Sequence, residues 1–429
     1  MYQLSGYYAF PLLAAANHAR EVSTAAVIAP PETSSHERRI TIALFAAGLT
    51  TFASMYSAQA LLPSLSAAFD ATPAHAALAV SLTTGLLAVA IIPMSVLSNR
   101  FGRTRMMIGS AVTASVIGLL LPFSPSLDVL LVGRAIQGIT LAGVPAVAMA
   151  YLAEEIGANG LGTAMGIYIA GNTVGGLGGR LIPAFTLEVA SWRWGEAMVG
   201  FASAVCAVIF VKMLPPSRNF APRPLDLRTL TRDFAGHLNH RILLPLFALA
   251  FVAMGSFVSI YNFLGYRLTR QPFGLSDATV GLIFILYLAG TFTSAAAGRL
   301  TARFGRNRVL VVGIATMAAG LLLTLPDQLF VILFGVLLCT AGFFAVHSIA
   351  SGWVGAAAEG NRAAASSLYL FAYYMGSSIA GGAAGFAYGR FGWAGLATYV
   401  GALILMAAAL VTTLATRSRR ATAARTALA

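Results

Sequence analysis

The stretch SVLSNRFGRTR, residues Ser95–Arg105, occurs a second time in similar form as GRLTARFGRNR, residues Gly298–Arg308. The second copy begins 203 residues after the first, and each copy lies between two long apolar runs. A repeat at this spacing indicates that the chain is an internal duplication joined near its middle. The positions that match are Leu97/Leu300, Arg100/Arg303, Phe101/Phe304, Gly102/Gly305, Arg103/Arg306 and Arg105/Arg308.

The composition is that of a membrane protein. Of the 429 residues 58% are hydrophobic and only 10% are charged, and the mean hydropathy is +0.80. A soluble domain could not bury so much apolar surface. We therefore expect an all-α membrane protein with twelve transmembrane helices in two pseudo-symmetric six-helix halves. The expected helices lie near 40–62, 75–98, 106–123, 128–152, 162–186, 194–214, 242–265, 278–299, 308–325, 328–353, 364–389 and 393–416.

The net charge of +13 comes mainly from arginines in short loops between the apolar runs. They form no continuous basic face, so the positive-inside rule explains them better than nucleic-acid binding. Their asymmetric distribution predicts that both termini are cytoplasmic. The expected segments are a flexible cytoplasmic tail (1–39), the N-terminal half (40–214), a cytoplasmic linker (215–241), the C-terminal half (242–416) and a second cytoplasmic tail (417–429).

The repeated loop resembles the signature between helices 2 and 3 of the major facilitator superfamily, Gly-x-Leu-x-Asp-Arg-x-Gly-Arg-(Lys/Arg). GRAIQG at Gly133–Gly138 resembles the helix 4 motif of that family, and AGNTVGG at Ala170–Gly176 resembles the helix 5 motif of its drug/proton antiporter branch. The stretches 134–155 and 166–182 are similar to bacterial inner-membrane permeases of the arabinose-efflux-like type. The resemblance covers about residues 40–416 and implies the major facilitator fold and solute transport.

The chain departs from these motifs at several positions. Asn99 and Ala302 replace the loop acid in the two copies, Ser95 replaces the leading glycine, and Asn172 replaces the antiporter-motif proline. In the family the loop acid helps to latch one conformation, so an amide should latch more weakly. The resemblance assigns gating to Asn99, Arg100, Gly102, Arg103, Arg303, Gly305 and Arg306. The alternative is that the arginines anchor the topology on anionic lipid.

Arg134 and Arg180 lie inside predicted spans, where an unpaired cation is unfavourable by several kcal/mol. Counted from the helix ends, both lie roughly 8–9 Å below the outer surface. We expect them to form a cavity wall that attracts a carboxylate or phosphate of the substrate. The alternative is structural: Arg134 would bond to helix ends or Gln59, and Arg180 would extend to Glu188 or water.

His347 is the one histidine in a predicted span, and no Asp or Glu is expected deep in the membrane. Its unperturbed pKa near 6.5 makes it the leading candidate for proton coupling, and a hydrogen-bonded packing role is the alternative. Glu154 and Glu155 are expected to be solvated at a loop. The residues expected to bind substrate are Tyr56, Gln59, Arg134, Gln137, Tyr168, Asn172, Arg180, Asn262, Tyr287, His347, Tyr369 and Tyr373.

The sequence contains no phosphate-binding loop, no His/Cys metal cluster and no nucleophile with a placed base, so we expect no enzyme activity, no cofactor and no metal. The resemblance implies a monomeric secondary transporter in a bacterial inner membrane, with a small-molecule substrate, protons and lipids as its partners. Export of a drug-like, sugar-like or anionic organic molecule in exchange for protons is the expected activity. The alternative is uptake or facilitated movement of a small organic anion without protons.

Overall fold

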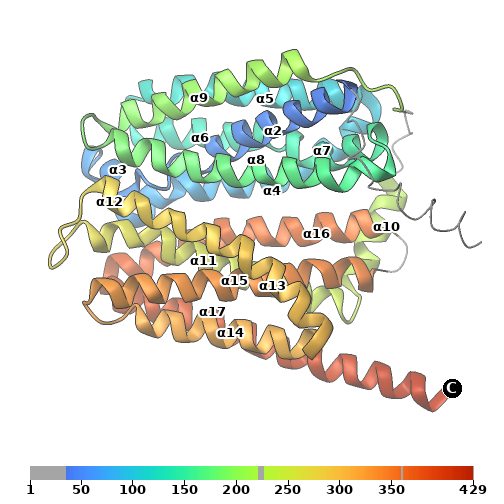
Figure 1. Ribbon diagram of the computed structural model, residues 1–429. Helices are drawn as coiled ribbons and strands as arrows, with labels where there is room; N and C mark the ends of the chain where they lie inside the picture. The colour runs from blue at the N-terminus through green and yellow to red at the C-terminus, as the bar shows by residue number, and fades with distance from the viewer. Residues whose placement is uncertain (1–34, 221–226, 359–360, 429) are drawn as a thin grey trace, which may run out of the picture.

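The computed structural model describes residues 35–220, 227–358 and 361–428, and the regular structure in these ranges is helical (Figure 1). Two helical bundles lie side by side, with α10 (Leu227–Leu238) between them along the chain. The N half comprises α2 (Ser35–Tyr56), α3 (Leu62–Ala68), α4 (Pro73–Phe101), α5 (Arg103–Leu120), η1 (Leu121–Phe123), α6 (Leu127–Leu141), α7 (Gly143–Glu155), α8 (Ala158–Thr186) and α9 (Trp192–Met213). The C half comprises α11 (Leu243–Leu268), α12 (Asp277–Leu282), η2 (Ile283–Tyr287), α13 (Leu288–Phe304), α14 (Arg306–Leu323), α15 (Leu329–Ala357), α16 (Arg362–Met375), η3 (Gly376–Ala380) and α17 (Gly381–Leu428).

The repeated loops are two equivalent tight turns. Gly102 ends α4 and precedes α5 with a φ of 94°, and Gly305 does the same between α13 and α14 with a φ of 83°. Residues with a side chain rarely adopt this backbone conformation, so glycine is the residue that the turn requires. The sequence repeat therefore corresponds to a repeated helix–turn–helix in the structure.

Ten helices in the described ranges are long and apolar enough to cross a membrane. One of these candidate spans, Arg362–Arg417, contains a break at Gly392, where φ is 61°. Dividing this span there gives eleven candidates, and the 29-residue α8, which is not among the ten, is long enough to be a twelfth. We call the side with α10 and the two glycine turns the linker side, and the side with α3 and the start of α12 the far side (Figure 1).

The helix ends differ from expectation at three places. The first span ends at Tyr56, and a turn and the short α3, with Pro63 in its first turn, follow it. The expected linker contains α10, because its sequence places apolar residues at helical spacing and Phe234 packs on the C-half core. Helix continues through the expected tails, since α2 begins at Ser35 and α17 runs to Leu428; residues 1–34 lie outside the described ranges.

Glycines allow α8 to lie directly on α2. A Cβ atom added at Gly171, Gly175 or Gly179 would come within 2.4–2.7 Å of backbone atoms of α2. Any larger residue would push the two helices apart. This close packing fixes α8, which carries Arg180, against the helix that carries Tyr56.

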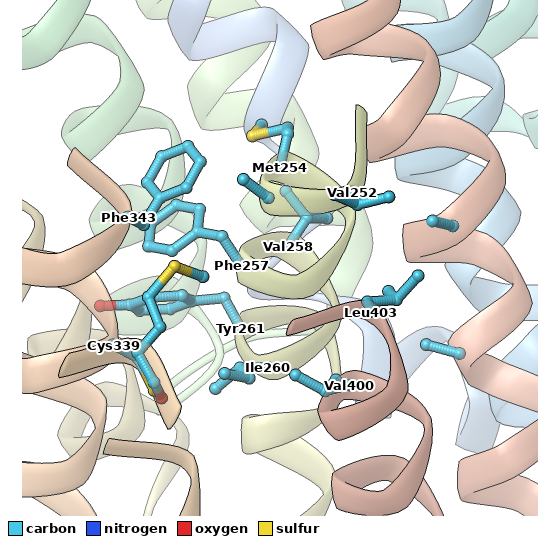
Figure 2. Packing of buried hydrophobic residues seen from close by; sticks show 14 of the residues in the cluster. Val252, Met254, Phe257, Val258, Ile260, Tyr261, Cys339, Phe343, Val400 and Leu403 are labelled. Carbon is cyan, nitrogen blue, oxygen red and sulfur yellow. The ribbon is translucent and has the colours of Figure 1, made fainter. Parts of the chain in front are cut away.

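The core of the C half is built around α11 (Figure 2). The rings of Phe257 and Phe343 stack with centroids 4.1 Å apart, and the Tyr261 hydroxyl lies 2.8 Å from Oγ1 of Thr340. These contacts join α11 to α15, and Val400 and Leu403 of α17 lie on another side of α11. Burial of such large apolar side chains stabilises the packing of the C half.

The two halves meet in their far-side portions. Tyr266 donates a hydrogen bond to the Leu62 carbonyl at 2.8 Å, and its hydroxyl is 2.6 Å from Oγ of Ser66. Ser378 donates to the Ser81 carbonyl at 2.6 Å, between η3 and α4. These hydrogen bonds join the two halves in their far-side portions.

Candidate functional site

A cavity of about 290 Å³ lies between the two halves. The N half contributes residues of α2 and α8, and the C half contributes residues of α11, η2, α13, α15 and α16. A cavity at such an interface, with apolar walls and a few polar groups, is the typical form of a small-molecule site. Its lining residues are Phe52, Tyr56, Ile169, Asn172, Thr173, Gly176, Leu177, Arg180, Met254, Phe257, Tyr287, Leu288, Thr291, Phe344, His347, Leu370, Tyr373 and Tyr374.

Half of the residues that the sequence predicts for substrate binding line this cavity. Helical spacing explains part of this set, because Asn172, Gly176 and Arg180 follow one another at intervals of four on α8. The predicted residues that line the cavity are Tyr56, Asn172, Arg180, Tyr287, His347 and Tyr373.

Arg180 is the cationic group of the cavity, and its side chain is held by neutral partners. Its Nε donates to Oε1 of Gln59 at 2.6 Å, and its Nη1 donates to the Gly176 carbonyl at 2.6 Å. The guanidinium carbon lies 3.9 Å from the ring centroid of Tyr56 and 4.5 Å from that of Tyr287. The two rings and the amide therefore fix the position of the charge in the cavity wall.

Gln59 and Asn262 lie beside the cavity rather than in its wall. Gln59 is in the turn after α2, and its Nε2 donates to Oδ1 of Asn262 of α11 at 2.6 Å. Because Gln59 also accepts from Arg180, the three side chains form one hydrogen-bonded chain from the cavity to the far-side contact between the halves.

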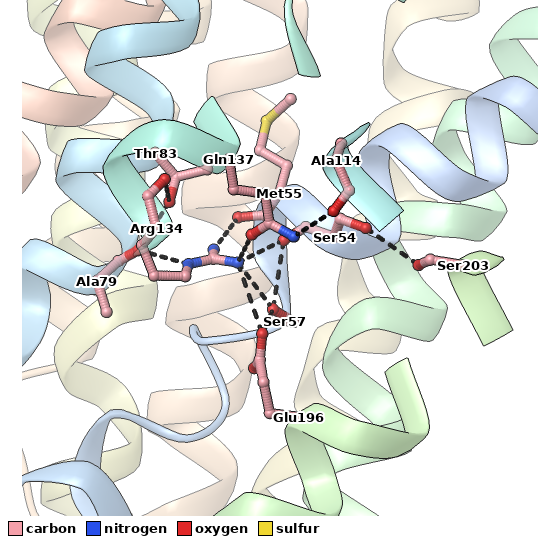
Figure 3. Close-up of polar contacts among 10 residues, drawn as sticks. All are labelled: Ser54, Met55, Ser57, Ala79, Thr83, Ala114, Arg134, Gln137, Glu196 and Ser203. Carbon is pink, nitrogen blue, oxygen red and sulfur yellow. Dashed lines mark hydrogen bonds and ion pairs between the residues drawn. The ribbon is translucent and has the colours of Figure 1, made fainter. Parts of the chain in front are cut away.

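Arg134 is not among the residues that line the cavity, contrary to the expectation that it forms part of the cavity wall, and its side chain points into a cluster of polar groups (Figure 3). Its side chain is 0% exposed and lies 3.7 Å from the carboxylate of Glu196. The carbonyl oxygens of Ala79, Ser54 and Met55, Oγ of Ser57 and Oε1 of Gln137 accept its hydrogen bonds at 2.7–3.0 Å. Arg134 thus ties α6 to α2 and α4 in the interior of the N half.

Three other predicted binding residues also lie outside the cavity wall. Gln137 is bonded to Arg134 and donates to the Ala114 carbonyl at 3.1 Å. Tyr168 is buried in the N-half core on the linker side. Tyr369 is buried behind His347, with its hydroxyl 3.0 Å from Nδ1 of the imidazole, so it supports a cavity residue instead of lining the cavity.

Glu196 is a buried acid on the far side, and the sequence analysis did not identify it as a functional residue. It lies in the first turns of α9, is 4% exposed and accepts a hydrogen bond from Ser57 at 2.8 Å. The requirement that a cation in a span be neutralised could have indicated it, because Arg134 and Glu196 both lie near the far side.

The predicted gating residues contact their own halves in this conformation. Arg103 donates from Nε and Nη2 to Glu154 at 2.9–3.3 Å and from Nη1 to Oγ of Ser98 at 2.6 Å. Arg306 lies over the ring of Trp353, with its guanidinium carbon 5.4 Å from the centroid. Arg100 and Arg303 lie beside the rings of the phenylalanines that follow them, and Asn99 is half-buried.

Glu154 and Glu155 are not simply solvated, contrary to expectation. Glu154 forms the ion pair with Arg103. One oxygen of Glu155 accepts hydrogen bonds from Ser217 and from the backbone N–H groups of Arg218 and Asn219 at 2.7–3.0 Å. The two acids therefore attach both the repeated loop and the start of the linker to the end of α7.

The chain matches the family model described as Major Facilitator Superfamily over residues 44–271 and 246–428. It is 43% identical over 370 residues to the uncharacterized MFS-type transporter YybF of Bacillus subtilis, covering 86% of this chain and 92% of that one. It is also 43% identical over 375 residues to the inner membrane transport protein YnfM of Escherichia coli, covering 87% and 90%.

Among solved structures, a bacterial homologue of the human lysosomal transporter Spinster, in an inward-facing and occupied conformation, matches with a TM-score of 0.73 at 17% identity. The match covers 90% of this chain and 97% of that one and shows the shared fold. The protein is accordingly a member of the Major Facilitator Superfamily, a membrane transport protein and not an enzyme.

Proposed function

We propose that this protein exports a small organic molecule, drug-like, sugar-like or anionic, across the bacterial inner membrane by alternating access and in exchange for protons. The observation that carries the proposal is the cavity between two halves whose hydrogen bonds to each other lie toward the far side. Small-molecule transport by members of this fold uses rocking of the two halves around such a central site.

The arginine distribution supports a cytoplasmic linker side with both termini inside. In that orientation the far side is periplasmic, and the conformation with closed far-side contacts is the one in which an exporter loads its substrate. The gating residues Asn99, Arg100, Gly102, Arg103, Arg303, Gly305 and Arg306 would then close the cytoplasmic side in the opposite state.

His347 is the residue that we propose to couple protons to transport. It is the histidine among the described cavity-lining residues, and Nδ1 lies 3.0 Å from the Tyr369 hydroxyl. The second candidate function is uptake or facilitated movement of an organic anion without protons. It is favoured by the absence of Asp and Glu from the described lining residues.

Alternating access is tested by paired spin labels on protein in which Cys206 and Cys339 have been replaced. A linker-side pair at Arg105 and Arg308 and a far-side pair at Ala67 and Arg270 use exposed positions in both halves. When the protein passes from one conformation to the other during transport, we expect one of these distances to shorten and the other to lengthen. Two distances that stay constant, or that change in the same direction, would contradict a rocking transporter.

A further inference from the structure

The two buried arginines of the N half differ in how their charges are neutralised. Arg134 has a carboxylate within 3.7 Å and is surrounded by acceptors. Arg180 is 3% exposed and has no carboxylate within ion-pair distance among the described residues. Its partners are an amide, a backbone carbonyl and tyrosines, all of them neutral.

The rest of the cavity wall does not supply the missing negative charge. The described lining residues contain neither Asp nor Glu, so no carboxylate of the cavity wall compensates the guanidinium of Arg180. A buried cation without a counter-ion is unfavourable, and an anion from outside would relieve this. The guanidinium has five N–H donors in a planar fork, and its contacts with Gln59, Gly176 and the Tyr287 hydroxyl occupy three of them. One donor on Nη1 and one on Nη2 remain for a carboxylate.

The surroundings of Arg180 also define the other end of a ligand. Rings of the C half form much of the remaining wall, among them Phe257, Phe344 and Tyr373, and Phe52 of the N half adds another ring. The guanidinium lies over the rings of Tyr56 and Tyr287. These contacts fix the position of the charge relative to the aromatic walls of the cavity. A flat apolar body can stack on such rings. The volume of about 290 Å³ lies at the small end of ligand sites.

We propose that the substrate is a small organic monoanion, with its carboxylate on Arg180 and a flat, apolar and preferably aromatic body against the rings of the cavity. A single charge is expected because the wall contains one arginine and no lysine among its described residues. This inference rests on the proposed transport function and narrows its substrate class.

The test compares acids with their neutral amides on the purified, full-length protein at pH 7.5. The probes are 1-naphthoate and phenylacetate, and their controls are 1-naphthamide and phenylacetamide. Both affinity and melting temperature are measured, because a ligand that binds the native state raises its stability. We expect the acids to bind and to raise the melting temperature, and the amides to have little effect. Amides that bind as tightly as the acids, or acids that do not bind, would overturn the proposal.

Variants of the protein test whether the carboxylate of the ligand binds at Arg180. Arg180→Gln should weaken acid binding by about tenfold to a hundredfold, which is the range for losing a charge-assisted hydrogen bond. Arg180→Lys should bind with intermediate affinity, because it keeps the charge and loses the planar fork. Arg390→Gln removes an exposed arginine elsewhere and should bind like the wild type. Binding that survives Arg180→Gln and is lost in His347→Gln would overturn the assignment to Arg180.

The spin-label distances distinguish a failure of the anion proposal from a failure of the proposed transport mechanism. If the halves rock while only neutral compounds bind, transport stands and the anion proposal falls. If the labels do not move although the acids bind at Arg180, the binding site stands and the transport mechanism falls.

Discussion

Gln59 and Asn262, which share a hydrogen bond of 2.6 Å across the interface, are 203 residues apart, the same spacing as the two repeated loops. They therefore occupy equivalent positions in the two repeats, one after α2 and the other in α11. A contact between equivalent positions is expected where the pseudo-symmetry axis of the duplication passes. This bond joins the halves next to Arg180, so occupancy of the cavity and closure of the far side share one residue, Gln59.

Replacement of Gln59 by Ala should open the far side. The change removes one buried hydrogen bond between the halves, worth about 0.5–1.5 kcal/mol, which would shift the populations by about two- to tenfold. The distance distribution of the Ala67/Arg270 spin-label pair measures this shift. Gln328→Ala, at an exposed position in the C half, is the matched control and should leave the distribution unchanged. An unchanged distribution in Gln59→Ala would exclude Gln59 from the far-side contact.

Arg134→Gln should destabilise the protein rather than impair substrate recognition alone. The change leaves the buried Glu196 without its counter-ion, and breaking a buried pair in this way is unfavourable by about 3–5 kcal/mol. Thermal unfolding of detergent-purified protein should show a clear loss of melting temperature. The double variant Arg134→Met/Glu196→Gln should recover part of the loss, because it removes both charges.

The control for this comparison is Arg193→Gln, which removes an arginine that lies over Trp192 and is bonded to the Ser124 carbonyl. It should unfold close to the wild-type temperature. Wild-type stability of Arg134→Gln together with lost transport would restore the interpretation of Arg134 as a substrate-attracting residue.

Arg134 and Arg180 show how much of the candidate site can be predicted from the sequence. Both Arg134 and Arg180 carry the same signal, a cation within an apolar span, and this correctly indicates that each needs compensation. Which one faces the cavity depends on Glu196, on a helix that is distant in sequence, and no local pattern contains that contact. By contrast, the turns at Gly102 and Gly305 are predictable because local backbone geometry dictates glycine there.

Acidification of the far side should weaken the contact between the two halves that Glu188 makes there. Its carboxylate accepts from the backbone N–H of Ala278 at the start of α12 at 2.7 Å, and this bond lowers the pKa of Glu188. The ionised carboxylate of Glu188 accepts this hydrogen bond, so the bond stabilises the far-side contact fully at neutral pH. This stabilisation is lost as the pH falls through the lowered pKa of Glu188, which lies below the ordinary carboxyl range. The nearby carboxyl group of Asp277 also faces Glu188.

We expect the Ala67/Arg270 distance to lengthen at low pH in the wild type. In Glu188→Gln the distance should already be longer at neutral pH and should depend less on pH. Asp70→Asn, at another exposed acid on the far side, serves as the control. A wild-type distance that is the same at neutral and low pH would show that Glu188 does not contribute to the far-side contact.

Removal of the imidazole of His347 should uncouple transport from the proton gradient. Gln keeps hydrogen-bonding capacity next to Tyr369 but cannot titrate near neutral pH. In proteoliposomes, His347→Gln should therefore lose the response to an imposed pH gradient and retain exchange of substrate between equal compartments. Tyr369→Phe removes the hydroxyl partner and leaves the imidazole, so it should still respond to the gradient.

A wild-type protein that ignores the gradient would favour facilitated movement without protons. A His347→Gln protein that follows the gradient would move the proton site to another group, and the buried acid Glu196 would be the next to replace.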